Sequence, residues 1–503
     1  MKSLIPSLFI IFLGIALYGS TIKGTFGNYK TVQQMTTLGE TTKPFESSHE
    51  RATFSQTISI LVHKRFDLPL DFANFSAPDV GYHKGKFFSY FPPGISFLIM
   101  PLYLFGSTLN LNLLLAYATI PLISVLSLIM LYLIASQIFR FPLWVSLASV
   151  MIYAFATTSW SYAITIYQHS ATTFLLLLMY YAVWKYTQAQ KMRVVWALVV
   201  GFSYGVSFFF DYPNAFLLLP IMIYFLISTV RYTAFRSKIT VGLSPTIILT
   251  GASVAIMMII FGSYNYKTYG NWKTLANHLP RYEITNLEKI KQYEKQKVTA
   301  RLGGVFLEER LPNGLYELTV APDKGLFLFS PILLLAIIGI IMSSKKMKLD
   351  RFILLCIIFT NLLLYASFSD PWGGWAYGPR YLIPSMAILS LFVGVYLSSI
   401  RLQGIAKIAT LILFIVSSSI ALLGALTTNA TPPQIEAAYF KIKYGILFNL
   451  DYLFMGKTGS YIYTTVFSHG ITLLHYFFVI ETLLLIIFSI VLFIVPRIFH
   501  YES

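Results

Sequence analysis

The sequence predicts an all-α protein that crosses a membrane about twelve times. Of its 503 residues, 56% are hydrophobic and only 11% are charged, and the mean hydropathy is +0.68. Soluble globular chains carry about a quarter charged residues. A net charge of +17 would suggest nucleic acid in a soluble protein, but here short-loop cations act as topology signals. We therefore expect membrane lipids, and no nucleic acid, as partners.

Apolar runs close to the ~20 residues that span a bilayer recur along the chain. The first begins at Ile5, and we expect a retained helix because "ALYGS" is a poor signal-peptidase site. The other expected spans are Leu111–Ser136, Leu143–Tyr153 with its extensions, Ser170–Val183, Val194–Phe210, Ala215–Ser228, Val241–Phe261, Leu326–Met342, Phe352–Phe368, Leu382–Ser398, Ile408–Leu426 and Ile471–Val495. Pro92–Leu104 is shorter and broken by proline, which favours a re-entrant or interfacial segment.

Cations alternate between successive short connections and predict the sidedness. The basic set comprises Arg140, Lys185, Lys191, Arg193, Arg231, Arg236, Lys238, Lys345, Lys346, Lys348, Arg351, Arg401, Lys407 and Arg497. The positive-inside rule then places both termini in the cytoplasm of a multi-pass cell-membrane protein. The long segments 21–90, 263–325 and 427–470 fall outside. We divide the chain into a transmembrane region with two outer segments, 1–426, and an outer loop with the last span, 427–503.

Acidic residues gather on the same outer side. Only Asp350, Glu481 and Glu502 of the 20 acids lie inside or within a span. An enzyme or receptor that works outside would have this distribution. A transporter should place polar groups near the bilayer midplane, where Glu481 is the only acid.

The first outer segment contains "SSHERATFSQTISIL", whose apolar residues recur at helical spacing. They predict an amphipathic helix on the membrane surface. Ser47 and Glu50 have the spacing of a capping box, so Glu50 reads first as a helix cap. The alternative is a general base at the membrane surface, with His49 beside it.

Further along this segment, Lys84 and Lys86 precede a Pro-Pro-Gly turn that enters an apolar run. A cation beside a broken apolar segment suits a lipid phosphate whose tail stays in the membrane. Ordinary snorkelling of lysine is the alternative. The prolines are the more specific feature, because they are costly in a span unless the backbone is buried in protein or lines a cavity.

Several expected helix ends on the outer side carry aromatic and polar groups. Tyr167 and His169 lie in "YQHS", and Asp211 in "DYPN". Singly, each tyrosine suits an interfacial aromatic belt. Together they could bind a sugar. The stretch "WGGWAYGPRY", Trp372–Tyr381, adds glycines that permit tight turns and a lone cation, Arg380. This cation could bind a ligand, and an ion pair with Asp370 is the alternative.

The order of these pieces resembles the GT-C superfamily of membrane glycosyltransferases. The nearest branch includes protein O-mannosyltransferases and the aminoarabinose transferases that modify lipid A. The resemblance is carried by Glu50-Arg51-Ala52, "GKFFSYFPPGISFLIMPLY", "YQHS", "KGLFLFSPILLL" and "GGWAYGPRYLIP". The tryptophan-rich WWDYG signature of oligosaccharyltransferases is absent, which argues against transfer of a complete glycan to asparagine.

The resemblance implies an inverting hexosyltransferase with a polyprenyl-phosphate-sugar donor and a protein, lipid or glycan acceptor outside the cytoplasm. It makes Glu50 the general base, with Asp79 as runner-up, and places Arg380, Lys84 and Lys86 at the donor phosphate. The remaining candidates for substrate binding are Arg51, Tyr82, Tyr167, His169, Asp211, Trp372, Trp375 and Tyr377. Many relatives carry Asp-Glu where this chain has His49-Glu50, so the identity of the base is open and a divalent metal at these two residues is possible.

Two other functions compete with the enzyme. A flippase or transporter for a lipid-linked sugar would share the groove and the cations, but should show inverted repeats, which the sequence lacks. A structural subunit of an envelope-assembly complex would not need the acid-containing aromatic face. Charges of both signs in Arg281–Arg310 predict a solvated helix, and Asn74 and Asn429 lie in weak glycosylation sequons.

Overall fold

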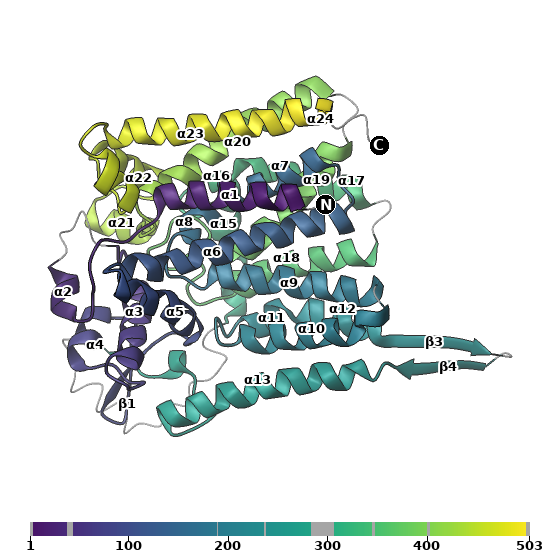
Figure 1. Cartoon of the computed structure of the whole chain (residues 1–503), viewed down its shortest axis with the longest axis horizontal. Coiled ribbons are helices and arrows are strands. Elements are labelled where there is room, and N and C mark those ends of the chain that lie inside the picture. Colours follow the sequence, from purple (N-terminus) through teal and green to yellow (C-terminus); the bar gives the residue numbers. More distant parts are fainter. Residues whose placement is uncertain are drawn as a thin grey trace.

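The computed structural model describes residues 4–37, 44–188, 190–235, 238–282, 306–344, 348–399 and 403–498. Figure 1 shows long helices lying roughly parallel, with α2, α3, α4 and β1 at one end of the bundle. The N-terminus, the C-terminus and the hairpin β3–β4 lie at the other end. The fold is therefore an all-α membrane bundle with a small folded cap at one end.

Each of the twelve expected spans coincides with helical structure. The bundle consists of α1 (Leu4–Thr21), α6 (Asn112–Leu133), η1 (Ile134–Ile138), α7 (Leu143–Phe155), α8 (Ser159–Ala163), α9 (His169–Gln188), η2 (Gln190–Met192), α10 (Arg193–Ser207), α11 (Asn214–Leu217), α12 (Leu219–Thr229), α13 (Thr246–Tyr269), α16 (Leu326–Phe329), η6 (Pro331–Leu333), α17 (Leu334–Ser344), α18 (Leu349–Ala366), η7 (Arg380–Leu382), α19 (Ile383–Ser399), α20 (Gln403–Leu426), α23 (Leu473–Ser489), η9 (Ile490–Ile494) and α24 (Val495–Ile498).

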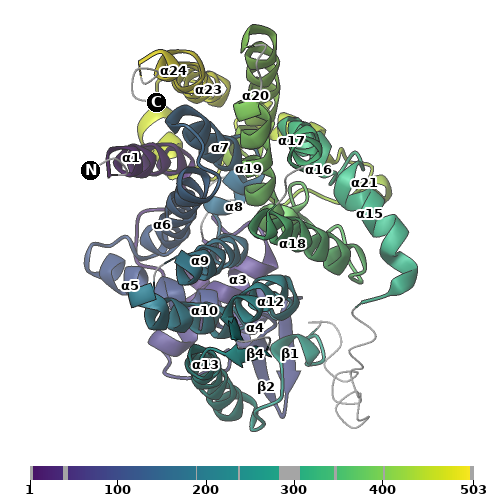
Figure 2. The same cartoon turned by 90° about the vertical axis from the view of Figure 1, so that its right-hand side faces the viewer.

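Seven described helices are long and apolar enough to cross a membrane alone. They are α1, α6 with η1, α13, α18, α19 with η7, α20, and α23 with η9 and α24. Other expected spans, such as α7 and α10, are shorter apolar helices. Figure 2 shows α13 at the edge of the bundle, beside α10. The protein thus crosses the membrane several times.

The elements outside the bundle lie mainly at its capped end. They are α2 (Val32–Thr36), α3 (Ser48–Leu61), α4 (Leu70–Ser76), β1 (Val80–His83), β2 (Lys86–Ser89), α5 (Gly94–Thr108), η3 (Ala276–His278), η5 (Glu308–Arg310), α15 (Leu311–Thr319), α21 (Gln434–Phe440), α22 (Gly445–Phe454) and η8 (Tyr463–Phe467). The hairpin β3 (Val230–Phe235) and β4 (Lys238–Leu243) projects from the opposite end. Both hairpins are antiparallel, and β1 pairs Val80 with Ser89.

Three details differ from the sequence expectations. The helix α3 is buried along most of its length, rather than on one side, because α4, α5 and β2 pack around it. Val241 belongs to β4, so α13 begins only at Thr246. Most of the charged stretch Arg281–Arg310 falls in 283–305, outside the described residues, and its last three residues form the 3-10 helix η5.

Candidate active site

Helix α3 begins with the predicted capping box. The Ser47 hydroxyl accepts from the Glu50 N–H at 3.3 Å, while Glu50 Oε2 accepts from the N–H groups of Ser47 at 3.3 Å and Glu46 at 2.9 Å. The Tyr117 hydroxyl donates to Glu50 Oε1 at 3.3 Å. Burial raises the pKa of Glu50 to about 7, although the positive charge of Lys23 opposes this. Glu50 is therefore a cap whose carboxyl group can also exchange a proton near neutral pH.

A second carboxylate belongs to Glu46, whose N–H is one of the donors to Glu50. Its Oε2 atom is 2.5 Å from the Nζ of Lys23 and accepts from the Asn429 N–H at 2.7 Å. The Lys23 side chain is almost completely buried. Three distant segments therefore meet at one carboxylate. No sequence motif predicted this group; the one available signal was Lys23 itself, a cation on the expected outer side, two residues after the end of α1.

Aromatic rings and Arg380 form a second cluster, the ring cluster, made of His49, Phe91, Tyr167, His169, Arg380 and Tyr381. The His49 ring lies 3.6 Å from that of Phe91 and 4.3 Å from that of Tyr167. The guanidinium carbon of Arg380 is 5.1 Å from the centre of the Tyr167 ring. Burial, followed by the positive charge of Arg380, lowers the pKa of His49 well below its usual range. His49 is thus neutral beside a permanent cation.

The loop that carries Arg380 has the tight turns that its glycines predicted. Gly373, Gly374 and Gly378 have φ of 71°, 63° and 65°, in the left-handed region. A Cβ at Gly373 would lie 2.9 Å from the Nε of Arg380, so the missing side chain lets the guanidinium approach the loop. That Nε is buried and has no hydrogen-bond partner among the described residues. The expected alternative, an ion pair between Arg380 and Asp370, is not among the ion pairs within 4 Å that the described residues form.

The aromatic residues of this loop have unequal environments. Trp375 is 39% exposed and donates from Nε1 to Glu436 Oε2 at 2.5 Å. Trp372 is partly buried. Tyr377 is completely buried, and its hydroxyl donates to the Ile420 carbonyl at 2.7 Å. Its ring therefore anchors the loop in the interior, where it cannot stack on a sugar, so the structure corrects its expected contact with substrate.

Asp211 lies next to the ring cluster. Its Oδ2 atom accepts from Gln168 Nε2 at 3.2 Å and from the Tyr365 hydroxyl at 3.4 Å. The Tyr365 ring stacks on that of Tyr381 at 4.3 Å. Burial raises the pKa of Asp211 to about 6. Asp211 is thus held close to the cluster by two donors.

The remaining acid and lysine candidates surround the hairpin β1–β2. Asp79, 16% exposed, accepts from the Ser48 hydroxyl at 2.6 Å and lies 3.8 Å from Arg281. Lys84 and Lys86 are exposed at the turn of the hairpin, and Tyr82 is buried against Phe87. The structure thus places Arg380 in the ring cluster, whereas the two lysines lie on the hairpin.

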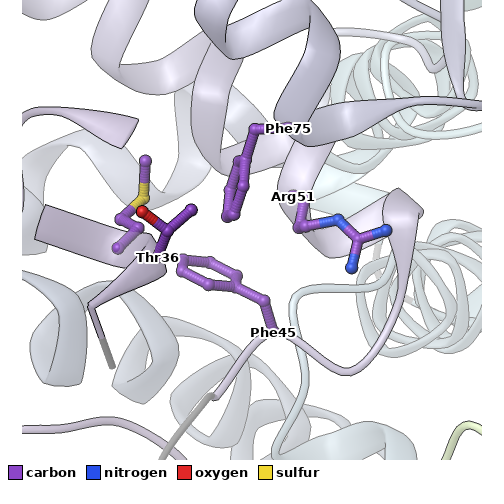
Figure 3. A pocket seen from close by; sticks show the side chains of 5 residues that line it. Thr36, Phe45, Arg51 and Phe75 are labelled. Atoms are coloured by element: carbon purple, nitrogen blue, oxygen red, sulfur yellow. The ribbon is translucent and has the colours of Figure 1, made fainter. Parts of the chain in front are cut away.

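Arg51 borders a cavity of about 220 Å³ in the folded cap. Figure 3 shows Phe45 and Phe75 facing it, and the guanidinium carbon of Arg51 lies 5.7 Å from the centre of the Phe75 ring. The cavity is also lined by Met35 and Thr36. Its walls are mostly apolar, and among the described residues Arg51 is the one charged residue that lines it.

An apolar groove of about 330 Å³ lies between α5, α10 and α13. It is lined by Gly94, Phe97, Leu98, Val206, Phe209, Phe210, Met257 and Ile260. The Gly94 N–H donates to the Phe209 carbonyl at 2.6 Å, and a Cβ at Gly94 would lie 2.3 Å from that oxygen. The Pro-Pro-Gly turn therefore brings α5 against the end of α10. It also brings the groove close to the ring cluster, because Phe91, which stacks on His49, directly precedes the turn.

Among the described residues, no group of three His, Cys, Asp or Glu side chains could hold a metal ion. His49 and Glu50 are adjacent but diverge, since the His49 ring stacks on Phe91 whereas Glu50 turns back to the helix cap. Asn429, in the second sequon, is 1% exposed, so its side chain is out of reach of a modifying enzyme in the folded protein.

This chain is similar to several solved structures and, in part, to one family model. The most similar solved structures include ArnT from Cupriavidus metallidurans bound to undecaprenyl phosphate, with a TM-score of 0.49, 11% identity and coverage of 96% of this chain and 76% of that chain. They also include the oligosaccharyltransferase AglB from Archaeoglobus fulgidus in complex with an inhibitory peptide and a dolichol-phosphate, with a TM-score of 0.41, 11% identity and coverage of 92% and 55%. A comparison with curated protein sequences gave no match. Residues 92–258 match the family model of dolichyl-phosphate-mannose-protein mannosyltransferases. This match confirms, for that part of the chain, the resemblance to membrane glycosyltransferases that the sequence motifs predicted.

Proposed function

We propose that this protein transfers a sugar from a polyprenyl-phosphate donor to a hydroxyl group of an acceptor on the outer face of the membrane. The observation that carries the proposal is the apolar groove beside the ring cluster. A prenyl chain requires an apolar surface within the bilayer, and its phosphate requires a cation where that surface ends. The groove and Arg380 supply both. The family match over residues 92–258 supports the same class of donor.

In the proposed reaction, the acceptor oxygen forms a bond to the anomeric carbon while the bond from that carbon to the phosphate oxygen breaks. The electron pair of the broken bond leaves with the polyprenyl phosphate. Arg380 stabilises the charge that develops on this leaving group. Attack from the side opposite the phosphate would invert the anomeric carbon and produce a transferred hexose of opposite configuration.

The acceptor proton requires a base, and Glu50 is our first candidate. Its raised pKa, about 7, suits proton transfer near neutral pH. Glu50 is also completely buried and forms the capping hydrogen bonds of α3, which supports a structural role for the same residue. Asp79 remains the runner-up because its carboxylate is more exposed. It also accepts a hydrogen bond from Ser48, the residue that precedes His49.

The full chain in proteoliposomes tests the proposal. Polyprenyl phosphates that carry single radiolabelled sugars, mannose among them, would be added with membrane extract as the source of acceptor. We expect free polyprenyl phosphate to appear together with labelled acceptor, and neither to appear with Arg380→Ala. Movement of intact labelled lipid across the bilayer, without loss of its sugar, would overturn the assignment as a transferase.

A further inference from the structure

A fully buried lysine, Lys324, lies where two chain segments meet. Its Nζ donates to the carbonyl of Ala376 and, at 3.2 Å, to that of Thr431. The Ala376 N–H also donates to the Thr431 carbonyl at 3.0 Å. Lys324 thus joins the loop that carries Arg380, which we call the arginine loop, to a segment between α20 and α21.

That segment, Thr427–Gln434, also reaches the acidic half of the site. We call it the strap. The Asn429 N–H donates to Glu46 Oε2 at 2.7 Å, and the Glu46 N–H in turn donates to Glu50 Oε2. At its other end, the Gln434 N–H donates to Asp323 Oδ2 at 3.0 Å. The strap therefore contacts Glu46 as well as the arginine loop, and Lys324 binds the strap near its middle, at Thr431.

Packing alone does not explain a lysine at this position. A buried ammonium group loses its hydration, and an apolar side chain of similar length would fill the same volume without that loss. Within the described chain, no acid lies within 4 Å of Lys324. Burial is the main effect that lowers the pKa of Lys324 to about 7, and the positive charge of Arg380 acts in the same direction. The negative charges of Asp323, Asp370 and Glu317 oppose this lowering. Even a neutral amine keeps two N–H donors, so the contacts with the two carbonyls persist in either state.

We propose that Lys324 is a positioning residue, which sets the location of Arg380 relative to the Glu46–Glu50 carboxylates by holding the arginine loop on the strap. The inference rests on the proposed function, in which Arg380 meets the donor phosphate. It assigns a role to a residue that touches neither donor nor acceptor. It also predicts that loss of the amine impairs recognition of the phosphate without impairing recognition of the prenyl chain.

The test compares binding of undecaprenyl phosphate and of undecaprenol, which lacks the phosphate, to the purified full-length protein. For Lys324→Met we expect about tenfold weaker binding of undecaprenyl phosphate, the size of one hydrogen bond to a charged group, and unchanged binding of undecaprenol. Lys324→Arg, which keeps the donors, should recover part of the loss. Lys443→Met is the matched control, because Lys443 forms an exposed ion pair with Asp451 at 2.7 Å, and it should change neither affinity.

A second variant covers the case in which Lys324→Met does not fold. Gln434→Pro removes the N–H that binds Asp323, at the first position of α21, where proline is tolerated. Pro433 already has φ −68° and ψ 153°, a conformation that a following proline allows. We expect the same selective loss, of about threefold, since one neutral donor is removed.

The two proposals fail in different ways. If the wild-type protein binds undecaprenol as tightly as undecaprenyl phosphate, the phosphate site of the proposed function is wrong. If the wild type discriminates and both variants discriminate equally well, Arg380 is positioned without Lys324 and the strap. An equal loss of affinity for both lipids would make Lys324 a general stabilising residue and overturn the positioning role.

Discussion

The guanidinium carbon of Arg380 lies 5.1 Å from the centre of the Tyr167 ring. The same ring lies 4.3 Å from that of His49, the neighbour of Glu50. Tyr167 therefore links the cation proposed for the phosphate to the helix that carries the proposed base. The hydroxyl of Tyr167 extends this link, since it donates to Ser47, the cap of that helix, at 2.7 Å.

Arg380→Ala should weaken binding of undecaprenyl phosphate by about 10- to 100-fold, because a hydrogen bond to a charged group contributes about 1.5–3 kcal/mol. Arg380→Lys should recover only part of it, because lysine lacks the planar fork that matches a phosphate. Equilibrium binding in detergent would measure both. Unchanged affinity in Arg380→Ala would remove this residue from the phosphate site.

Glu50→Gln should lower the rate of sugar transfer by about 10²–10⁴-fold, the usual contribution of a positioned general base. The amide oxygen can still accept from the N–H groups of the cap, so the fold should persist. Single-turnover release of polyprenyl phosphate is the measurement, with Asp79→Asn in parallel. A normal rate in Glu50→Gln together with a severe loss in Asp79→Asn would exchange the roles of the two acids.

Stability should depend on pH through Glu50. Its pKa is raised from the ordinary value of 4.5 to about 7 in the folded protein, so the folded state binds more protons between these two values. The stabilisation is therefore complete below about pH 4.5 and is lost as pH rises through 7, a change of at most roughly 3 kcal/mol. Thermal unfolding of wild type and Glu50→Gln from pH 4.5 to 8 would reveal it. The difference in melting temperature between them should vary with pH, and a constant difference would contradict a raised pKa.

Leu98→Trp should obstruct the apolar groove. We expect the KM for a long-chain polyprenyl donor to rise while that for a short-chain analogue changes little, because only the long chain extends along the groove. Leu126→Trp is the matched control, since Leu126 is 41% exposed on α6 and does not line the groove. Equal effects of both substitutions on the long-chain donor would place the prenyl chain elsewhere.

Gly378→Ala should destabilise the arginine loop. Its φ of 65° is unfavourable for alanine, and the added Cβ would lie 2.8 Å from the Cγ2 of Thr158. A left-handed non-glycine residue costs about 1–3 kcal/mol, which should lower both the melting temperature and the affinity for undecaprenyl phosphate. Gly251→Ala, in open space on α13, should leave both unchanged.

The helical architecture could be predicted because long apolar runs have few other stable forms in a membrane. The capping box and the left-handed glycines were also predictable, since each depends on residues close together in the chain. The partners of Glu46 were not, because Lys23 and Asn429 reach it from distant segments. Lys324 was recognised only as part of a motif. Its two acceptors are backbone carbonyls, which every residue type carries, so the sequence does not reveal them. The burial of Tyr377 likewise depends on Phe329 and Ile420, which its own loop does not specify.

The contact between Asn429 and Glu46 also bears on the order of synthesis. The segment that follows α1 is made early, yet its Glu46 carboxylate acquires this donor only when the chain has been extended past residue 429. The expected boundary at residue 426 lies between these two residues in the sequence. A nascent protein should insert its early helices and form the apolar groove well before the two halves of the site are joined. Ribosome-bound chains that end near residue 426 should consequently bind undecaprenol but discriminate poorly in favour of its phosphate.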